Sequence, residues 1–172
     1  WTDHELGDII DTHSYPHPSC PTHATRAAVC GEYGGITLKE PGHIWPGGDF
    51  QYTVVETKSD FTDYFNMLCD EIKDLYYMGL NAAVYTQIAD VEIEKNGFLT
   101  YDRKVLKTDN PAKIRAKIQE VLDMPHSDMK VTPIISTSGS HRYKWRYSFS
   151  ADVPRHWQEP GFDDSSWPLG EG

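Results

Sequence analysis

The segment RAAVCGEYGGI, residues Arg26 to Ile36, decides the predicted fold. Its apolar run Ala27 to Cys30 is typical of a short buried strand, and the glycines around Glu32 let such a strand end abruptly. Because alternate side chains of a strand share a face, Ala28, Cys30 and Glu32 are expected to point the same way. A carboxylate at the carboxyl end of a buried strand is where α/β enzymes place their chemistry, whereas the alternative is a solvated turn glutamate.

The preceding segment, IIDTHSYPHP, predicts a second short strand. Its alternation places Asp11, His13 and Tyr15 on one face, and Pro16 ends it because proline cannot continue a central ladder. A polar trio near the end of a strand suits a site where hydrogen bonds are aimed, although a solvent-facing edge strand remains the alternative. The connection to Arg26 is short and rich in proline, which is unusual for a parallel crossover.

A helix and a third strand follow. An apolar stripe at helical period begins after Ser59, the expected N-cap, and Gly79 is the expected end of the helix. Ala82 to Thr86 then predicts a buried strand, and the order strand, helix, strand predicts parallel neighbours. Polar side chains crowd the carboxyl end of this strand and are candidate ligand contacts: Gln87, Asp90 and Glu92.

Two further segments complete this part of the chain. The long stretch after Gly35 is rich in glycine and proline, and its His43 and Trp45 favour an active-site wall. Residues 94–107 are expected to form an irregular loop or a small hairpin that turns at Asn96-Gly97. A second helix is expected to begin at Asn110, its N-cap, with proline in its first position.

The final part of the chain has a different pattern. Residues 1–125 are expected to form one α/β domain, residues 126–130 a linker, and residues 131–172 the start of a β-rich domain. From Tyr143 to Phe149 aromatic and polar residues alternate, which predicts a half-buried strand with its aromatic side chains inward.

Composition excludes some classes of function. The 172 residues carry a formal net charge of -10, which argues against a nucleic-acid partner, and no apolar run is long enough to span a membrane. The three cysteines lack metal-ligand spacing, and neither a metal nor a cofactor is assigned; Cys30 and Cys69 are expected to be buried free thiols. The chain is expected to begin inside a domain, so that the absence of a signal peptide does not locate the protein.

Five motifs, in this order and spacing, resemble the last part of the catalytic barrel of glycoside hydrolase family 2, which includes β-galactosidases, β-glucuronidases and β-mannosidases. The motifs are IIDTHSYPHP, AAVCGEYGG, GHIW, GLNAAVYTQIADVE and NGFLTYDRKVLK, within residues 7–124. The resemblance implies a partial (β/α)8 TIM barrel containing its last three strands. The FDDSSW tail is similar to the opening of the galactose-binding-like β-sandwich of some glycosidases.

The resemblance also implies a mechanism. Glu32 falls on the nucleophile of a retaining β-glycoside hydrolase, with a β-glycoside as partner and a secreted or periplasmic location suspected from the family. Contacts with the sugar are expected from the following residues: His13, Tyr15, Tyr33, His43, Trp45, Gln87, Asp90 and Glu92. The family's acid/base glutamate lies on an earlier strand, so the rest of a parent chain is expected to close the barrel and the chain alone to be inactive.

Two other classes stay open. The first is a carbohydrate-binding module that keeps a barrel remnant without its chemistry, and a parent lacking the upstream glutamate would favour it. The second is an acidic interaction domain that assembles through the aromatic strand at residues 143–149. Association that depends on concentration, without sugar binding, would favour this second class.

Overall fold

The computed structural model describes residues 3–125, 144–149 and 153–171. The chain forms two compact units, residues 1–131 and 132–172. The expected linker at 126–130 and the first residue of the expected aromatic strand, Tyr143, lie outside the described residues. In the part of the chain that is described, no helix has the length and apolar character needed to cross a membrane.

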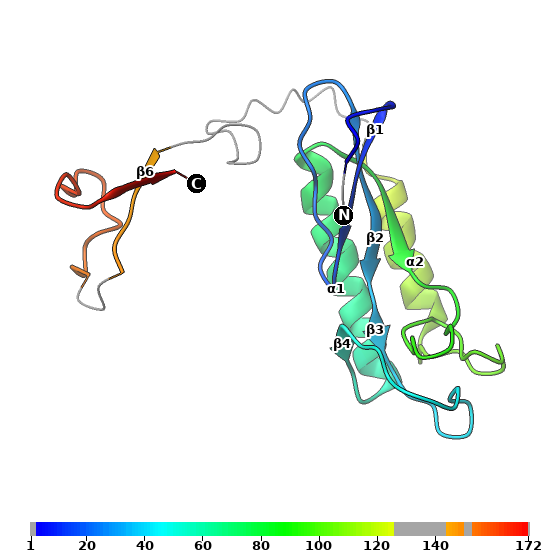
Figure 1. Ribbon diagram of the computed structural model, residues 1–172. Helices are drawn as coiled ribbons and strands as arrows, with labels where there is room; N and C mark the ends of the chain where they lie inside the picture. The colour runs from blue at the N-terminus through cyan, green and yellow to red at the C-terminus, as the bar shows by residue number, and fades with distance from the viewer. Residues whose placement is uncertain (1–2, 126–143, 150–152, 172) are drawn as a thin grey trace. The chain divides into compact units, whose positions relative to one another are not determined.

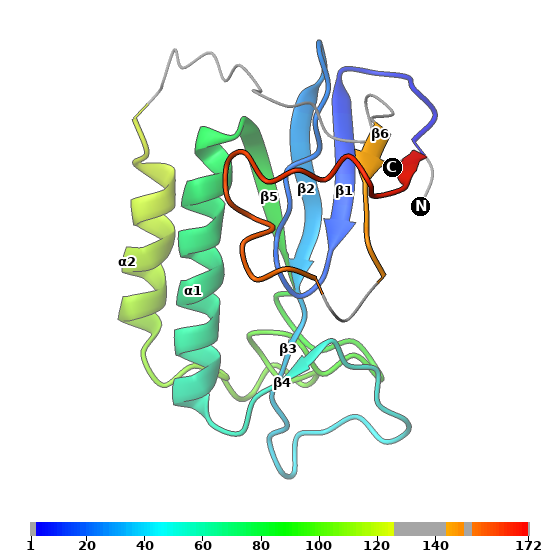
Figure 2. The ribbon, with the colours of Figure 1, turned by 90° about the vertical axis from the view of Figure 1, so that its left-hand side faces the viewer.

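The first unit is built on a parallel sheet of three strands, β1 (Ile9–Ser14), β2 (Ala27–Gly34) and β5 (Leu80–Thr86), with β2 in the centre. Both pairings are parallel, which confirms the strands and the directions expected from the sequence. Figures 1 and 2 show the three strands side by side. The connection from β1 to β2 contains no helix within its fully described residues 15–26, so the crossover there is a loop.

The first unit also contains two helices. Helix α1 (Lys58–Tyr77) packs on the sheet through Phe65, Leu68 and Ile72, as predicted, and these side chains share one core with Cys30. Helix α2 (Pro111–Leu122) begins at the expected Asn110 cap and lies along α1 (Figure 2). Cys30 and Cys69 are buried free thiols, as expected.

The predicted N-cap of α1 is wrong by two residues. Thr57, not Ser59, is the N-cap: its hydroxyl accepts a hydrogen bond from the Asp60 backbone N–H, and the Asp60 carboxylate accepts one from the Thr57 backbone N–H. This reciprocal pair is a capping box, which satisfies two backbone donors at once. Ser59 lies inside the first turn, where a hydroxyl is not needed for capping.

Replacing Thr57 by Ala is therefore expected to lower the free energy of unfolding by about 1 kcal/mol, because a backbone donor at the start of α1 loses its partner. Ser59→Ala is the matched control and is expected to change stability by less than about 0.5 kcal/mol. Urea denaturation of both variants measures the difference. Equal effects, or a larger loss for Ser59→Ala, would return the cap to Ser59.

The loops beyond the sheet have structure of their own. Strands β3 (Ile36–Thr37) and β4 (Thr53–Val54) form a short parallel pair that closes the base of the long glycine-rich loop. The hairpin alternative at Asn96-Gly97 is wrong, because Phe98 and Leu99 instead donate backbone hydrogen bonds to Gln87 and Ile88. The irregular-loop alternative holds for this segment.

The second unit contains an antiparallel pair, β6 (Lys144–Arg146) and β7 (Leu169–Glu171). The expected inward-facing aromatics are not buried: Trp145 is 48% exposed and Phe149 is 94% exposed. Among the described residues of this unit no second sheet lies over the two-stranded ribbon, so these rings keep much of their surface exposed.

Candidate functional site

The carboxyl ends of the three parallel strands gather most of the polar side chains that the sequence singled out. His13 pairs in register with Glu32 across β1 and β2, and Gly34 pairs with Thr86 across β2 and β5. Tyr15 follows β1 directly. Since parallel strands end at one edge of their sheet, these residues meet there.

A β-bulge at Gly31 sets the direction of Glu32. Thr12 pairs with Cys30 and His13 with Glu32, so β2 carries one residue more than β1 at this point, and the β2–β5 register shifts in the same stretch. An extra residue breaks the two-residue alternation and re-aims the side chains that follow it. The expectation that Cys30 and Glu32 share a face is therefore wrong. Cys30 and Tyr33 are in the core with α1, whereas Glu32 contacts His13 and Tyr15.

The carboxylate of Glu32 is held through one of its two oxygens. The Tyr15 hydroxyl donates a hydrogen bond of 2.6 Å to Oε2, and Nδ1 of His13 lies 3.0 Å from the same oxygen. The Glu32 side chain is 43% exposed, so the group is open to solvent. Among the described residues no hydrogen bond or ion pair engages Oε1 of Glu32, so this oxygen is the one free to meet a ligand.

Tyr15 is itself held in place from two sides. Its hydroxyl oxygen accepts a hydrogen bond from the Thr86 hydroxyl at 2.9 Å, and its ring stacks on Tyr52 with centroids 3.9 Å apart and an angle of 8° between the planes. Burial, reinforced by the hydrogen bond to Glu32, raises the pKa of Tyr15 above its ordinary value. The phenol therefore stays protonated at neutral pH and keeps its role as a donor to Glu32.

Tyr33, another predicted ligand contact, does not reach this site. Its side chain is 4% exposed and makes an edge contact with Tyr85 inside the core, at 5.6 Å between centroids. Burial raises the pKa of Tyr33 above its ordinary value. The bulge that turns Glu32 out of the core turns Tyr33, the next residue, into it.

His43 and Trp45 form a second cluster rather than joining Glu32. Nδ1 of His43 lies 2.8 Å from Oδ2 of Asp102, and Trp45 meets Tyr101 edge-to-face at 5.4 Å. These two contacts fasten the long loop to residues 100–105. Trp45 keeps 40% of its surface exposed, so it can still offer a ring face to a ligand.

The three candidate ligand contacts after β5 lie in different environments. Gln87 donates to Oδ1 of Asn96 at 2.7 Å and, more weakly, to Glu94 at 3.4 Å. Asp90 is buried and contacts Nζ of Lys107 at 2.5 Å, so its carboxylate is occupied inside the loop. Glu92 is exposed on a turn with a positive φ of 52°.

The structure adds residues that the sequence reasoning did not assign to the site. Tyr52 stacks on Tyr15, and burial together with the carboxylates Glu94 and Glu32 raises its pKa. Asp11 belongs to the polar trio that strand alternation predicted together with His13 and Tyr15, but no role was assigned to it. Tyr52 belongs to the long loop that was expected to form a wall of the site, whereas nothing local in the sequence pointed to Glu94.

The carboxylate of Asp102 accepts hydrogen bonds that lower its pKa. Hydrogen bonds from the Thr100 hydroxyl, at 2.6 Å, and from His43 lower its pKa from the ordinary 3.8 to about 2. Because the folded-state pKa is depressed, its stabilising contribution is present above pH 4 and is lost as the pH falls toward 2.

We therefore expect Asp102 to titrate near pH 2 in the folded protein and nearer 3.8 after Thr100→Val, which removes the stronger donor. Carboxyl NMR measured against pH gives both values. Asp70, whose pKa is lowered by Lys117 and Lys73, is the internal control, and its titration should be the same in both proteins. An unchanged Asp102 titration in the variant would show that Thr100 does not set it.

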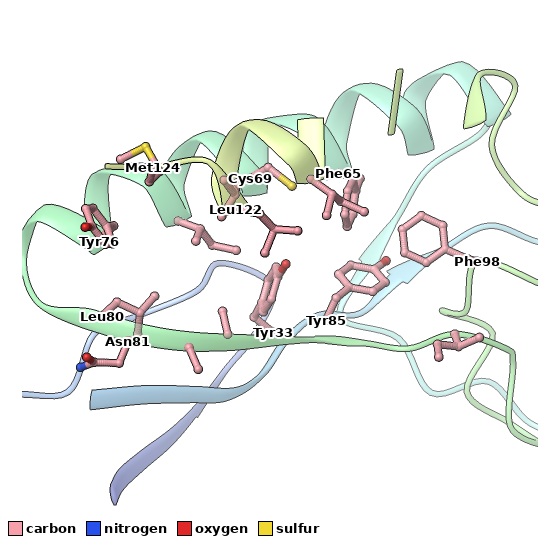
Figure 3. A pocket seen from close by; sticks show the side chains of 16 residues that line it. Tyr33, Phe65, Cys69, Tyr76, Leu80, Asn81, Tyr85, Phe98, Leu122 and Met124 are labelled. Carbon is pink, nitrogen blue, oxygen red and sulfur yellow. The ribbon is translucent and has the colours of Figure 1, made fainter. Parts of the chain in front are cut away.

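An apolar cavity of the first unit is separate from this site. It has a volume of about 570 Å³ and lies between β5 and the two helices, lined mainly by apolar and aromatic groups such as Phe65, Ile72, Leu80 and Val121 (Figure 3). Tyr33 borders this cavity, whereas Glu32 and His13 do not. The cavity is thus an extension of the core and is separate from the polar side chains at the strand ends.

No group of three or more metal-binding side chains is arranged to hold an ion among the described residues. Comparison with protein-family models and with curated proteins found no match for the chain.

Proposed function

We propose that residues 7–124 form the last part of the (β/α)8 catalytic domain of a retaining β-glycoside hydrolase, in which Glu32 is the nucleophile. The observation that carries the proposal is the half-anchored carboxylate: Oε2 is fixed by Tyr15 and His13, and Oε1 is left open at the strand ends. An ionised carboxylate fixed in this way is preorganised to attack in one direction. In the proposed barrel, β1, β2 and β5 are the sixth, seventh and eighth strands.

The proposed reaction is a double displacement. Oε1 of Glu32 bonds to the anomeric carbon while the bond to the leaving oxygen breaks, and a carboxylic acid outside residues 1–172 gives that oxygen its proton. The same outside group then removes a proton from water, which displaces Glu32 and restores it. Tyr15 and His13 hold the carboxylate during attack, and Trp45 and Gln87 are proposed to contact the sugar.

A 2-deoxy-2-fluoro β-glycoside with a dinitrophenolate leaving group tests this proposal. Its leaving group needs no acid, and its fluorine slows the second step, so the covalent intermediate accumulates. We expect the complete catalytic domain to gain the mass of one fluorosugar, and peptide mapping to place it on Glu32. A panel of galactosyl, glucosyl and mannosyl reagents identifies the sugar. A label on another carboxylate would remove Glu32 from the role.

A second candidate function is carbohydrate binding without turnover. The exposed aromatic side chains of the second unit, among them Trp145 and Trp157, favour it because flat rings stack on sugar faces. Sugar binding by a complete domain that neither hydrolyses β-glycosides nor takes the fluorosugar label would support this candidate instead.

A further inference from the structure

Asp11 makes two contacts that no assigned role accounts for. Its Oδ1 accepts a hydrogen bond of 2.7 Å from the backbone N–H of Gly31, across β1 and β2. Its Oδ2 lies 3.3 Å from Nε2 of His13, whose other ring nitrogen contacts Glu32. One carboxylate thus touches both supports of Glu32: the bulge that precedes it and the imidazole beside it.

The first contact completes the bulge. Gly31 is the extra residue of β2 and has no partner residue in the register of either neighbouring strand. Its N–H therefore needs an acceptor from elsewhere, and the Asp11 carboxylate supplies it. A Cβ at position 31 would overlap this carboxylate, so glycine is required for the close approach.

The second contact orients the ring of His13. The orientation of an imidazole is set by the partner of the nitrogen that does not face the site. Asp11 is that partner at Nε2, and the result is that Nδ1 faces Oε2 of Glu32. A displaced ring would leave Tyr15 as the remaining described anchor of the carboxylate.

We propose that Asp11 is a positioning residue that holds the Gly31 bulge and the His13 ring together, and so directs Oε1 of Glu32 toward the substrate. The inference rests on the proposed function only for the identity of the attacking atom. The part of it that concerns geometry can be measured without any turnover.

Three variants distinguish the loss of the two Asp11 contacts from the loss of a negative charge alone. Asp11→Ala removes both contacts. Asp11→Asn keeps an oxygen for the Gly31 N–H but replaces the carboxylate beside His13. Asp8→Asn is the control, because it removes the same negative charge from an exposed residue just before β1.

In the complete catalytic domain, Asp11→Ala is expected to lower the rate of the glycosylation step by roughly 10- to 100-fold, with the affinity for the product sugar unchanged. Asp11→Asn is expected to recover a substantial part of the rate, and Asp8→Asn to stay within about twofold of the parent. An Asp11→Ala rate within about threefold of the parent would overturn the proposal.

Amide hydrogen exchange provides the readout that does not depend on activity. Exchange at Gly31 is expected to be at least about tenfold faster in Asp11→Ala and near the parent value in Asp11→Asn, which retains the acceptor. If Asp11→Ala fails to fold, the Asp11→Asn variant still tests the idea through the ¹⁵N signals of His13, which should change at Nε2. Unchanged His13 signals would overturn it. Absence of turnover in the parent with the exchange effects present would contradict the proposed function but not the role of Asp11.

Discussion

Replacing Glu32 by Gln is expected to reduce the hydrolysis of β-glycosides by several orders of magnitude in the complete enzyme while leaving sugar binding largely intact. The amide keeps the shape of the side chain, and its oxygen can still accept from Tyr15. It cannot form the covalent bond to the anomeric carbon or oppose the positive charge that develops there. Loss of one hydrogen bond to a ligand costs only about 0.5–1.5 kcal/mol, so the effects on rate and on affinity should separate.

Steady-state kinetics and calorimetric binding of the product sugar measure the two effects. Glu56→Gln is the matched control, because Glu56 is exposed and makes no contact with the Glu32 group in the described part of the chain. Glu32→Ala adds a further test: azide can enter the vacated space and attack the anomeric carbon directly, giving an α-glycosyl azide from a β-glycoside. Substantial hydrolysis by Glu32→Gln would show that another group is the nucleophile.

The second large effect is expected at the buried ion pair of Asp90 and Lys107. Both side chains are almost fully buried, and Nζ of Lys107 also donates to the carbonyl oxygen of Lys95 at 3.0 Å. Burial raises the pKa of Asp90 and lowers that of Lys107, so desolvation opposes both charges while their contact offsets part of that cost. Removing one partner leaves an uncompensated charge in the interior.

Lys107→Met is accordingly expected to lower the free energy of unfolding by about 3–5 kcal/mol at pH 7. The loss should shrink toward pH 4: the raised folded-state pKa of Asp90 rises further without Lys107, and a protonated Asp90 is tolerated in the interior. Urea denaturation at several pH values measures this dependence.

Two further variants control this experiment. Lys104→Met makes the same change at a side chain that is 73% exposed and is expected to cost less than about 0.5 kcal/mol. The double variant Asp90→Asn with Lys107→Met removes both charges and keeps an acceptor for the Gly97 N–H, so it should recover more than half of the loss. If Lys107→Met lowered the free energy of unfolding by less than about 1 kcal/mol, the ion pair of Asp90 and Lys107 would not be what stabilises this loop.

Several features of this protein follow from the sequence alone. The apolar period of α1, the Asn110-Pro111 start of α2 and the three strands with their parallel direction were all predicted correctly. These features depend on periodicity and capping within a few residues, and such short-range preferences are readable from the chain itself. Strand patterns placed His13, Tyr15 and Glu32 near the ends of two predicted strands, whereas their grouping around one carboxylate was an expectation from the family resemblance.

The tertiary structure alone decided how these residues are aimed. The bulge at Gly31 exists only relative to the register of β1 and β5, and it sends Glu32 toward His13 and Tyr33 into the core. Strand alternation read from β2 by itself therefore gave the wrong face for Glu32. An extra residue in one strand becomes visible only when its neighbours are in place.

Contacts between residues far apart in the sequence also depend on the tertiary structure. Tyr52 reaches Tyr15, and Lys107 reaches Asp90, because the loops fold back on the strand ends. Asp90 is therefore part of a buried ion pair and not a ligand contact. This depends on Lys107, which lies 17 residues away in the sequence. The sequence determined which segments form helices and strands, because that choice is made locally. The tertiary structure determined which carboxylates are buried and which face solvent, because burial is a property of the assembled chain.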